Sequence, residues 1–253
     1  MATALSSKIA VIVLRHTKLG ESDAILTMLA ADGSQVRGIA KGVRKSPSRF
    51  GASLEPYTVA EVQLYSKRSL PMITDAKIIE SNQKCRDDLE RSAAASVVAA
   101  ILMLISQEGQ QERRIFDLST TALRYLGTAA LEAVPLLLTA YIFKVLAMHG
   151  YRPLLDSCVC CGAGVAHEDI RWFSAVGGGV VCEVCTSKVA SSAISPQTIS
   201  WIAYVLQNTF ETIANDTSLS AHQQQELLQF AAVWIRAQLD TRIKPLDFYL
   251  SLL

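Results

Sequence analysis

The sequence from Ile9 to Ala40 reads IAVIVLRHTKLGESDAILTMLAADGSQVRGIA and alternates between short apolar runs and turn signals. Lys18–Asp23 is a polar turn, and Asp32-Gly33 is a typical signal for a β-hairpin between two strand-forming runs. The sequence therefore predicts three short strands, at Ile9–Leu14, Ala24–Leu29 and Gln35–Ala40.

Two further strands are predicted before residue 80. Tyr57–Tyr65 follows Pro56 and alternates between polar and apolar side chains, as a half-buried strand does. Leu70–Ala76 is the fifth strand. Five short strands in about eighty residues favour a small closed or partly open barrel, and the OB-fold is the leading candidate. We expect an OB-fold domain at residues 1–80.

After Lys77 the sequence changes in character, because Gly and Pro become scarce and the apolar residues recur at helical spacing. We expect a helical domain at residues 81–253. Ser220 is a candidate N-cap and Gly150 a candidate C-cap. The predicted helices are Ser92–Gln107, Arg113–Tyr125, Leu131–His149, Pro196–Phe210 and Ser220–Leu239.

Four cysteines form two Cys-x-x-Cys pairs with twenty residues between them: Cys158, Cys161, Cys182 and Cys185. Each pair lets two thiolates converge on one tetrahedral ion, and the second pair completes the shell. Sulfur fills all four positions, so this pattern predicts a structural Zn²⁺ and not a catalytic one. We expect a zinc-binding insertion at residues 156–188 within the helical domain, and therefore an α+β multidomain protein.

Other interpretations of the cysteines remain open. A redox dithiol of the thioredoxin type needs one Cys-x-x-Cys at the start of a helix, not two matched pairs. Unrelated buried cysteines would not cluster in this way. Cys160 lies inside the first pair and is an alternative ligand to Cys161, although the two-residue spacing favours Cys161. Cys85 is distant in sequence and is interpreted as an ordinary buried thiol.

The net charge is only +1, so affinity for a polyanion must come from a local patch. The segment RGIAKGVRKSPSR, residues 37–49, contains five cations and no acidic residue. On an exposed loop of a small barrel such cations predict a phosphate-binding surface, whereas the alternative is a loop that charge merely keeps solvated. The candidate DNA-binding residues are Arg37, Lys41, Arg44, Lys45 and Arg49, with Lys67 and Arg68 in the turn between the last two strands.

Catalytic signatures are not found in the sequence, and we expect the protein not to be an enzyme. The Gly177–Gly179 run is followed by Val-Val-Cys and lacks the lysine of a phosphate-binding loop. No histidine belongs to a His-Glu-x-x-His pair. The N-terminus does not resemble a signal peptide, and the most apolar runs, Ala93–Ser106 and Ala133–Phe143, are shorter than a bilayer requires. We expect a cytoplasmic protein without a membrane-spanning segment.

Four stretches together resemble the RecO family of bacterial recombination mediators. They are KLGESDAILTMLAADGSQVRGIAKGVRK (18–45), LEPYTVAEVQLY (54–65), HGYRPLLDSCVCCG (149–162) and FSAVGGGVVCEVC (173–185). The resemblance covers the predicted barrel and the cysteine-bearing segment. The remaining helical segments are similar mainly in type and order.

The resemblance implies an OB-fold, a helical domain and a zinc site. It implies binding to single- and double-stranded DNA, annealing of complementary strands, and a location with the nucleoid in the cytoplasm. It further implies that the protein acts with RecR to load RecA onto DNA coated by single-strand binding protein, whose acidic C-terminal tail it contacts. By resemblance the family's basic barrel segment falls on Arg37, Lys41, Arg44 and Lys45, and its metal ligands fall on Cys158, Cys161, Cys182 and Cys185.

Two other functions compete with this interpretation. One is a non-enzymatic OB and zinc-ribbon scaffold of another nucleic-acid-processing assembly, which predicts only weak, non-specific binding to oligonucleotides. The other is a thiol enzyme that uses Cys160 or Cys161, which predicts a rapidly alkylated thiol of low pKa.

Overall fold

The computed structural model describes residues 5–66, 70–166 and 169–253. By compactness the chain divides into two units, Met1–Thr128 and Ala129–Leu253. The first unit holds the β-barrel and three helices. The second holds the remaining helices and a small cysteine-bearing ribbon. The predicted boundary at residue 80 marks the end of the barrel, and the predicted domain limits remain proposals.

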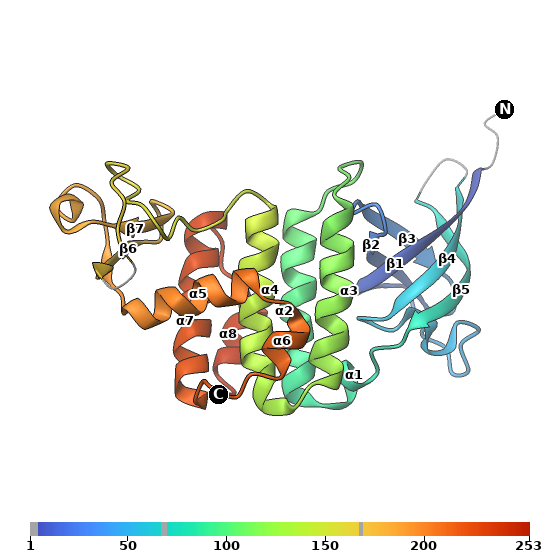
Figure 1. Cartoon of the computed structure of the whole chain (residues 1–253). Helices are drawn as coiled ribbons and strands as arrows, with labels where there is room; N and C mark the ends of the chain where they lie inside the picture. Colours follow the sequence, from blue (N-terminus) through green and yellow to red (C-terminus); the bar gives the residue numbers. More distant parts are fainter. Residues whose placement is uncertain (1–4, 67–69, 167–168) are drawn as a thin grey trace. The chain divides into compact units, whose positions relative to one another are not determined.

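Five strands form a closed barrel in the order β1-β2-β3-β5-β4 (Figure 1). Neighbouring strands are antiparallel except at the junction of β3 and β5, which is parallel. This barrel, followed by helices and a four-cysteine cluster, confirms the predicted fold class. The strands are β1 (Leu5–Leu19), β2 (Asp23–Ala30), β3 (Gln35–Ala40), β4 (Val59–Ser66) and β5 (Met72–Glu80).

The strand limits differ from the predicted ones where local geometry decides them. Strand β4 begins at Val59 and not at Tyr57, because Tyr57 has a positive φ of 69° that a strand does not accommodate. Strand β1 continues to Leu19 across a bulge between Val13 and Arg15. A bulge bends a strand while preserving its pairing, and the hydrophobic pattern alone does not reveal it.

The barrel closes through a short seam between β3 and β5. Ile39 pairs with Met72, and the Ile39 N–H donates to the carbonyl of Pro71 at 2.8 Å. A Cβ atom on Gly38 would lie 3.0 Å from Cγ1 of Ile73, so this glycine permits the close approach of the two strands. Among the described residues, this seam has a single register pair, fewer than any other junction of the barrel.

Three helices complete the first unit: α1 (Lys84–Asp87), α2 (Leu89–Ile105) and α3 (Arg113–Thr128). Helix α2 packs against both β1 and α3 (Figure 1). The side chain of Asp88 caps α2 by accepting a hydrogen bond from the Arg91 N–H at 2.9 Å. Gln35 of β3 donates to the carbonyls of Met103 and Ser106, each at 3.3 Å, so the barrel is hydrogen-bonded to the end of α2.

The second unit is built around α4 (Val134–Met148), which follows a short 3₁₀ turn, η2 (Leu131–Ala133). Most of its side chains are buried, and it contacts three other helices of the same unit. Leu131–Met148 is long and apolar enough to cross a membrane, but 72% of this segment is buried within the protein, as in a core helix. The other helices are α5 (Pro196–Gln207), α6 (Phe210–Ala214), α7 (Ala221–Leu239) and α8 (Lys244–Leu250).

Caps explain where the helices of the second unit begin and end. Ser220 forms a capping box with Gln223, which confirms the predicted start of α7. The helix predicted over Pro196–Phe210 instead ends at Gln207, because Thr209 caps the separate helix α6 through the Thr212 N–H. The short helices α1, α6 and α8 were not predicted, because each has too few turns to show an apolar period.

The ribbon contains three short strands in the order β7-β6-β8: β6 (Trp172–Ser174), β7 (Gly179–Val181) and β8 (Ser192–Ala193). Phe173 attaches it to α7 by edge-to-face contacts with Phe230 and Trp234, at ring-centroid distances of 5.0 and 5.7 Å. Gln238 of α7 also donates to the carbonyl of Ala175 at 2.5 Å. The ribbon thus has both an apolar and a polar attachment to α7.

Candidate metal centre and nucleic-acid interface

Four thiols converge at the end of the ribbon. The Sγ atoms of Cys158, Cys161, Cys182 and Cys185 all lie within 4.8 Å of one another. The Sγ atoms of Cys161 and Cys182 are 3.7 Å apart. A tetrahedral ion with Zn–S bonds of about 2.3 Å requires sulfurs separated by about 3.8 Å. The cluster therefore has the size and donor chemistry of a four-thiolate metal site.

Tight backbone turns bring the two cysteine pairs together. In the first, the Cys158 N–H donates to the Ala163 carbonyl at 2.8 Å and the Gly162 N–H donates to the Cys158 carbonyl at 2.9 Å. Gly162 adopts a positive φ of 74°, which glycine tolerates without strain. In the second, the Cys185 N–H donates to the Cys182 carbonyl at 2.9 Å. The two turns therefore place the four Sγ atoms around one common position.

Gly179 is required by a close approach of two chains beside the cluster. It pairs with Leu154, and a Cβ atom on Gly179 would lie 2.3 Å from the Leu154 carbonyl oxygen. The glycine-rich run before the second cysteine pair thus has a packing role.

The backbone around Cys158 favours a thiolate. Burial raises the pKa of this thiol, but backbone N–H groups of Cys182, Cys160 and Cys161 outweigh burial and lower the pKa to about 6. The hydrogen bond from the Cys182 N–H to Sγ measures 3.3 Å. Thiolates are the form that binds metal, so the residues present fit a bound zinc ion. The identity of the metal remains a prediction.

The converging set contains Cys161 and not Cys160, as the spacing predicts. The Cys160 side chain is exposed. Cys85 is fully buried beside Leu123, and burial raises its pKa to about 11. A thiol in that state is a poor nucleophile, consistent with the interpretation of Cys85 as a packing residue.

The five predicted cations between residues 37 and 49 are all exposed, but two of them make contacts within the barrel. The Arg44 guanidinium donates to the carbonyls of Gly20 and Glu21 at 3.2 and 3.1 Å. The Arg49 guanidinium donates to the Ile73 carbonyl at 3.3 Å and lies 4.5 Å from the centroid of the Phe50 ring. These two arginines therefore fasten the loop to the barrel.

Arg37, Lys41 and Lys45 have no hydrogen-bond or ion-pair partner among the residues that the structure describes. Asp23 holds the start of the loop by accepting a hydrogen bond from the Gly42 N–H at 2.8 Å. This bond and one from Ser22 lower the pKa of Asp23, and the nearby Lys41 and Lys45 lower it further. The loop is thus anchored while its lysines remain available.

Lys67 and Arg68 lie outside the described residues, so their predicted role remains a prediction. The structure adds a cation that the sequence analysis missed. Arg15 stands opposite Thr27, which in turn stands opposite Arg37, so the two arginines share one face of the barrel. The bulge before Arg15 shifts the register of β1 and conceals this relation in the sequence.

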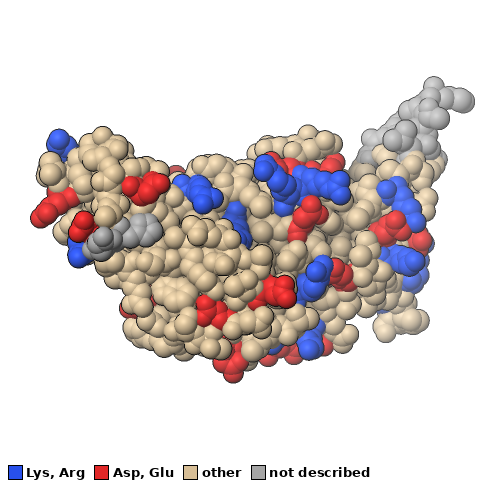
Figure 2. All heavy atoms as spheres, in the orientation of Figure 1, with Lys and Arg blue, Asp and Glu red and all other residues tan. Residues whose placement is uncertain are grey.

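Two other cations of the barrel lie near an acidic residue. Lys8 forms an ion pair with Glu61 at 2.7 Å, and Lys77 stands directly opposite Glu61 in the register of β4 and β5. Figure 2 shows basic and acidic side chains intermixed over the barrel on the face that it displays. Glu61 thus partly balances the positive charge of these two lysines. The cations of β3 and its loop have no ion-pair partner among the described residues.

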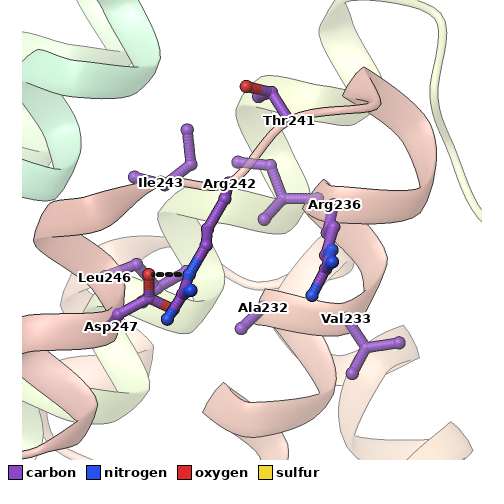
Figure 3. A pocket seen from close by; sticks show the side chains of 9 residues that line it. Ala232, Val233, Arg236, Thr241, Arg242, Ile243, Leu246 and Asp247 are labelled. Carbon is purple, nitrogen blue, oxygen red and sulfur yellow. Dashed lines mark hydrogen bonds and ion pairs between the residues drawn. The ribbon is translucent and has the colours of Figure 1, made fainter.

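A groove of about 140 Å³ lies between α7 and α8. Ile243 and Leu246 contribute an apolar lining, and Arg236 and Arg242 flank it (Figure 3). Arg242 donates through Nε to Asp247 at 2.6 Å. Sequence analysis did not find this groove, because it depends on α8 folding back beside α7.

Comparison with known proteins links both units to one family. The family model described as "Recombination protein O N terminal" matches residues 3–82. The model described as "Recombination protein O C terminal" matches residues 86–247. Together these matches cover the barrel, the helices and the ribbon.

Curated relatives match nearly the whole chain. One from Frankia casuarinae is 35% identical over 94% of this chain and 95% of its own length. One from a Nocardioides species is 31% identical over 94% of this chain and 96% of its own. A third, from a Thermoanaerobacter species, is 26% identical over 94% of both chains. All three are named DNA repair protein RecO.

Proposed function

Because the chain belongs to the RecO family of DNA repair proteins, we propose that it is a non-enzymatic recombination mediator. In this proposal it anneals complementary DNA strands and, with RecR, helps load RecA onto single-stranded DNA coated by single-strand binding protein. It acts in the cytoplasm, at the nucleoid.

The observation that carries the proposal is the unpaired positive charge of Arg37, Lys41 and Lys45 on an anchored part of the barrel. Each cation that contacts a phosphate releases condensed counterions, which drives binding to any sequence. Two DNA strands repel each other through their phosphates, and a cationic surface that binds both lowers this repulsion. Annealing by this route requires charge and position but no reacting side chain.

The cysteine cluster supports a structural role for zinc in this proposal. Four sulfurs fill the coordination shell, so no position is left for a water or a substrate. The contacts of Phe173 with Phe230 and Trp234 then connect a metal-stiffened ribbon to α7. The proposed ligands are Cys158, Cys161, Cys182 and Cys185, and the bound zinc supplies rigidity.

We further propose that the acidic C-terminal tail of single-strand binding protein occupies the groove between α7 and α8. Arg236 has no ion-pair partner among the described residues, and Arg242 keeps its terminal nitrogens free while Nε is bound to Asp247. Two guanidinium groups beside an apolar lining suit a peptide that carries a carboxylate and an apolar side chain (Figure 3).

The proposal is tested by a double variant, Lys41→Gln with Lys45→Gln, in the full-length protein. Binding to a single-stranded oligonucleotide is measured at several salt concentrations. We expect the slope of the logarithm of the binding constant against the logarithm of the salt concentration to become shallower by about 1.4, because each phosphate contact contributes about 0.7. Annealing of two complementary oligonucleotides should slow in the same variant.

The matched control is Lys188→Gln with Lys244→Gln, which removes two exposed cations from the second unit. Its slope should equal that of the unmodified protein. An unchanged slope in the Lys41 and Lys45 variant would remove these residues from the interface. A protein that binds no oligonucleotide even at low salt would refute the mediator function itself.

A further inference from the structure

The outer face of β1, β2 and β3 carries a row of three residues with an arginine at each end. Arg15 of β1 is the register partner of Thr27 of β2, and Thr27 is the partner of Arg37 of β3. Directly opposed residues in adjacent strands project their side chains to the same face of a sheet. Both arginines are exposed, so both guanidinium groups are accessible from one side of the barrel.

Helix α2 limits this face on one side. The preceding row consists of Ile12, Leu29 and Gln35, in which Ile12 and Leu29 are fully buried. Gln35 in the same row is hydrogen-bonded to the end of α2 through the carbonyls of Met103 and Ser106. The row with Arg15 and Arg37 is therefore the first row next to α2 whose end residues are exposed to solvent.

The following row is less polar. It contains Thr17, Ile25 and Ile39, and the two isoleucines are half-buried. Beyond it lie Lys41 and Lys45 in the loop that follows β3. The open face thus presents a cationic row, an apolar row and then further cations.

Neither Arg15 nor Arg37 has a hydrogen-bond or ion-pair partner in the part of the chain that the structure describes. By contrast, Lys8 of β1 forms an ion pair with Glu61 of β4, and Lys77 of β5 stands opposite the same glutamate. Unpaired arginines at matched register on one face indicate a site for an anion that extends across strands.

We propose that Arg15 acts with Arg37 as a phosphate-binding row, so that a single strand of DNA crosses β1, β2 and β3 on the outer face of the barrel. Two strand spacings separate the arginines by about 10 Å, so one strand contacts both through different phosphates. Its bases lie over Ile25 and Ile39, and such contacts do not select a sequence. This inference rests on the proposed function and extends the interface to β1, which the basic loop does not include.

The test is Arg15→Gln in the full-length protein, compared with Lys77→Gln as a control of equal charge change on β5. We expect Arg15→Gln to lower the log–log salt slope for a single-stranded oligonucleotide by about 0.7 and to weaken binding about fivefold at 0.1 M salt. Lys77→Gln should leave the slope unchanged. Thermal unfolding should be alike in both variants, because both side chains are exposed.

Equal effects of Arg15→Gln and Lys77→Gln on the slope would show that only the net charge of the protein matters. That result would refute the proposal that Arg15 and Arg37 bind phosphates as a row. An unchanged slope in Arg15→Gln, beside a reduced slope in the Lys41 and Lys45 variant, would overturn this inference and leave the proposed function intact. Unchanged slopes in both would refute the barrel interface as a whole.

Discussion

At the scale of single residues, two glycines allow the backbone turns and close approaches that bring the two cysteine pairs of the ribbon together. Gly162 allows the first cysteine turn, and Gly179 allows the chain at Leu154 to approach β7. The N–H groups around Cys158 already stabilise a negative sulfur. Burial raises the pKa of the Cys182 and Cys185 thiols, so metal binding at this site is coupled to the release of their protons.

Gly179→Ala should destabilise the ribbon, because its Cβ would lie 2.3 Å from the Leu154 carbonyl oxygen. We expect a loss of about 1–3 kcal/mol in the free energy of unfolding, typical of overpacking. Thermal unfolding with measurement of retained zinc checks this. The control is Gly164→Ala, since nothing lies within 4 Å of a Cβ at Gly164. Equal loss in both variants would contradict the argument.

At the scale of elements, the sequence predicts most of the structure that depends on local pattern. The apolar runs and turn signals predict all five strands, and Ser220 predicts the start of α7 through its capping box. The cysteine spacing predicts the four thiols that converge. The prediction fails where the outcome depends on contacts distant in sequence. The bulge that aligns Arg15 with Arg37 and the return of α8 beside α7 are two such cases.

The groove formed by α7 and α8 gives an element-scale prediction. Arg236→Gln should weaken binding of the acidic C-terminal peptide of a single-strand binding protein about tenfold, as expected for loss of one charge-assisted hydrogen bond. Fluorescence anisotropy of the labelled peptide measures this. Lys244→Gln is the control, because Lys244 is exposed on α8 but does not line the groove. Unaltered affinity in Arg236→Gln would exclude the groove as the tail site.

At the scale of the whole molecule, the proposed DNA-binding residues and the cysteine cluster belong to different compact units. The cations lie in residues 1–128 and the thiols in residues 129–253. The barrel forms its own hydrophobic core, which contains no cysteine of the cluster. The two functions are therefore expected to respond separately to metal removal.

A strong chelator should release the zinc and expose residues 156–188 to protease, because binding of a structural ion is part of the folding free energy of its site. Oligonucleotide affinity should change less than about twofold, since the proposed phosphate contacts are charge interactions within the barrel unit. Limited proteolysis and a parallel titration measure the two effects. A loss of DNA affinity in proportion to metal loss would mean that the ribbon itself contacts DNA.

The short seam between β3 and β5 has a consequence for solubility. Among the described residues, Ile39 and Met72 are the one register pair that joins β3 to β5, so the rest of β3 has no described partner on that side. Exposed edges recruit strands from other molecules, and charged side chains on an edge oppose such fibre-like stacking. Arg37 supplies that charge on β3. The Arg49 guanidinium donates a hydrogen bond to the Ile73 carbonyl of β5. We therefore expect Arg37 and Arg49 to oppose edge-to-edge association between two copies of the barrel.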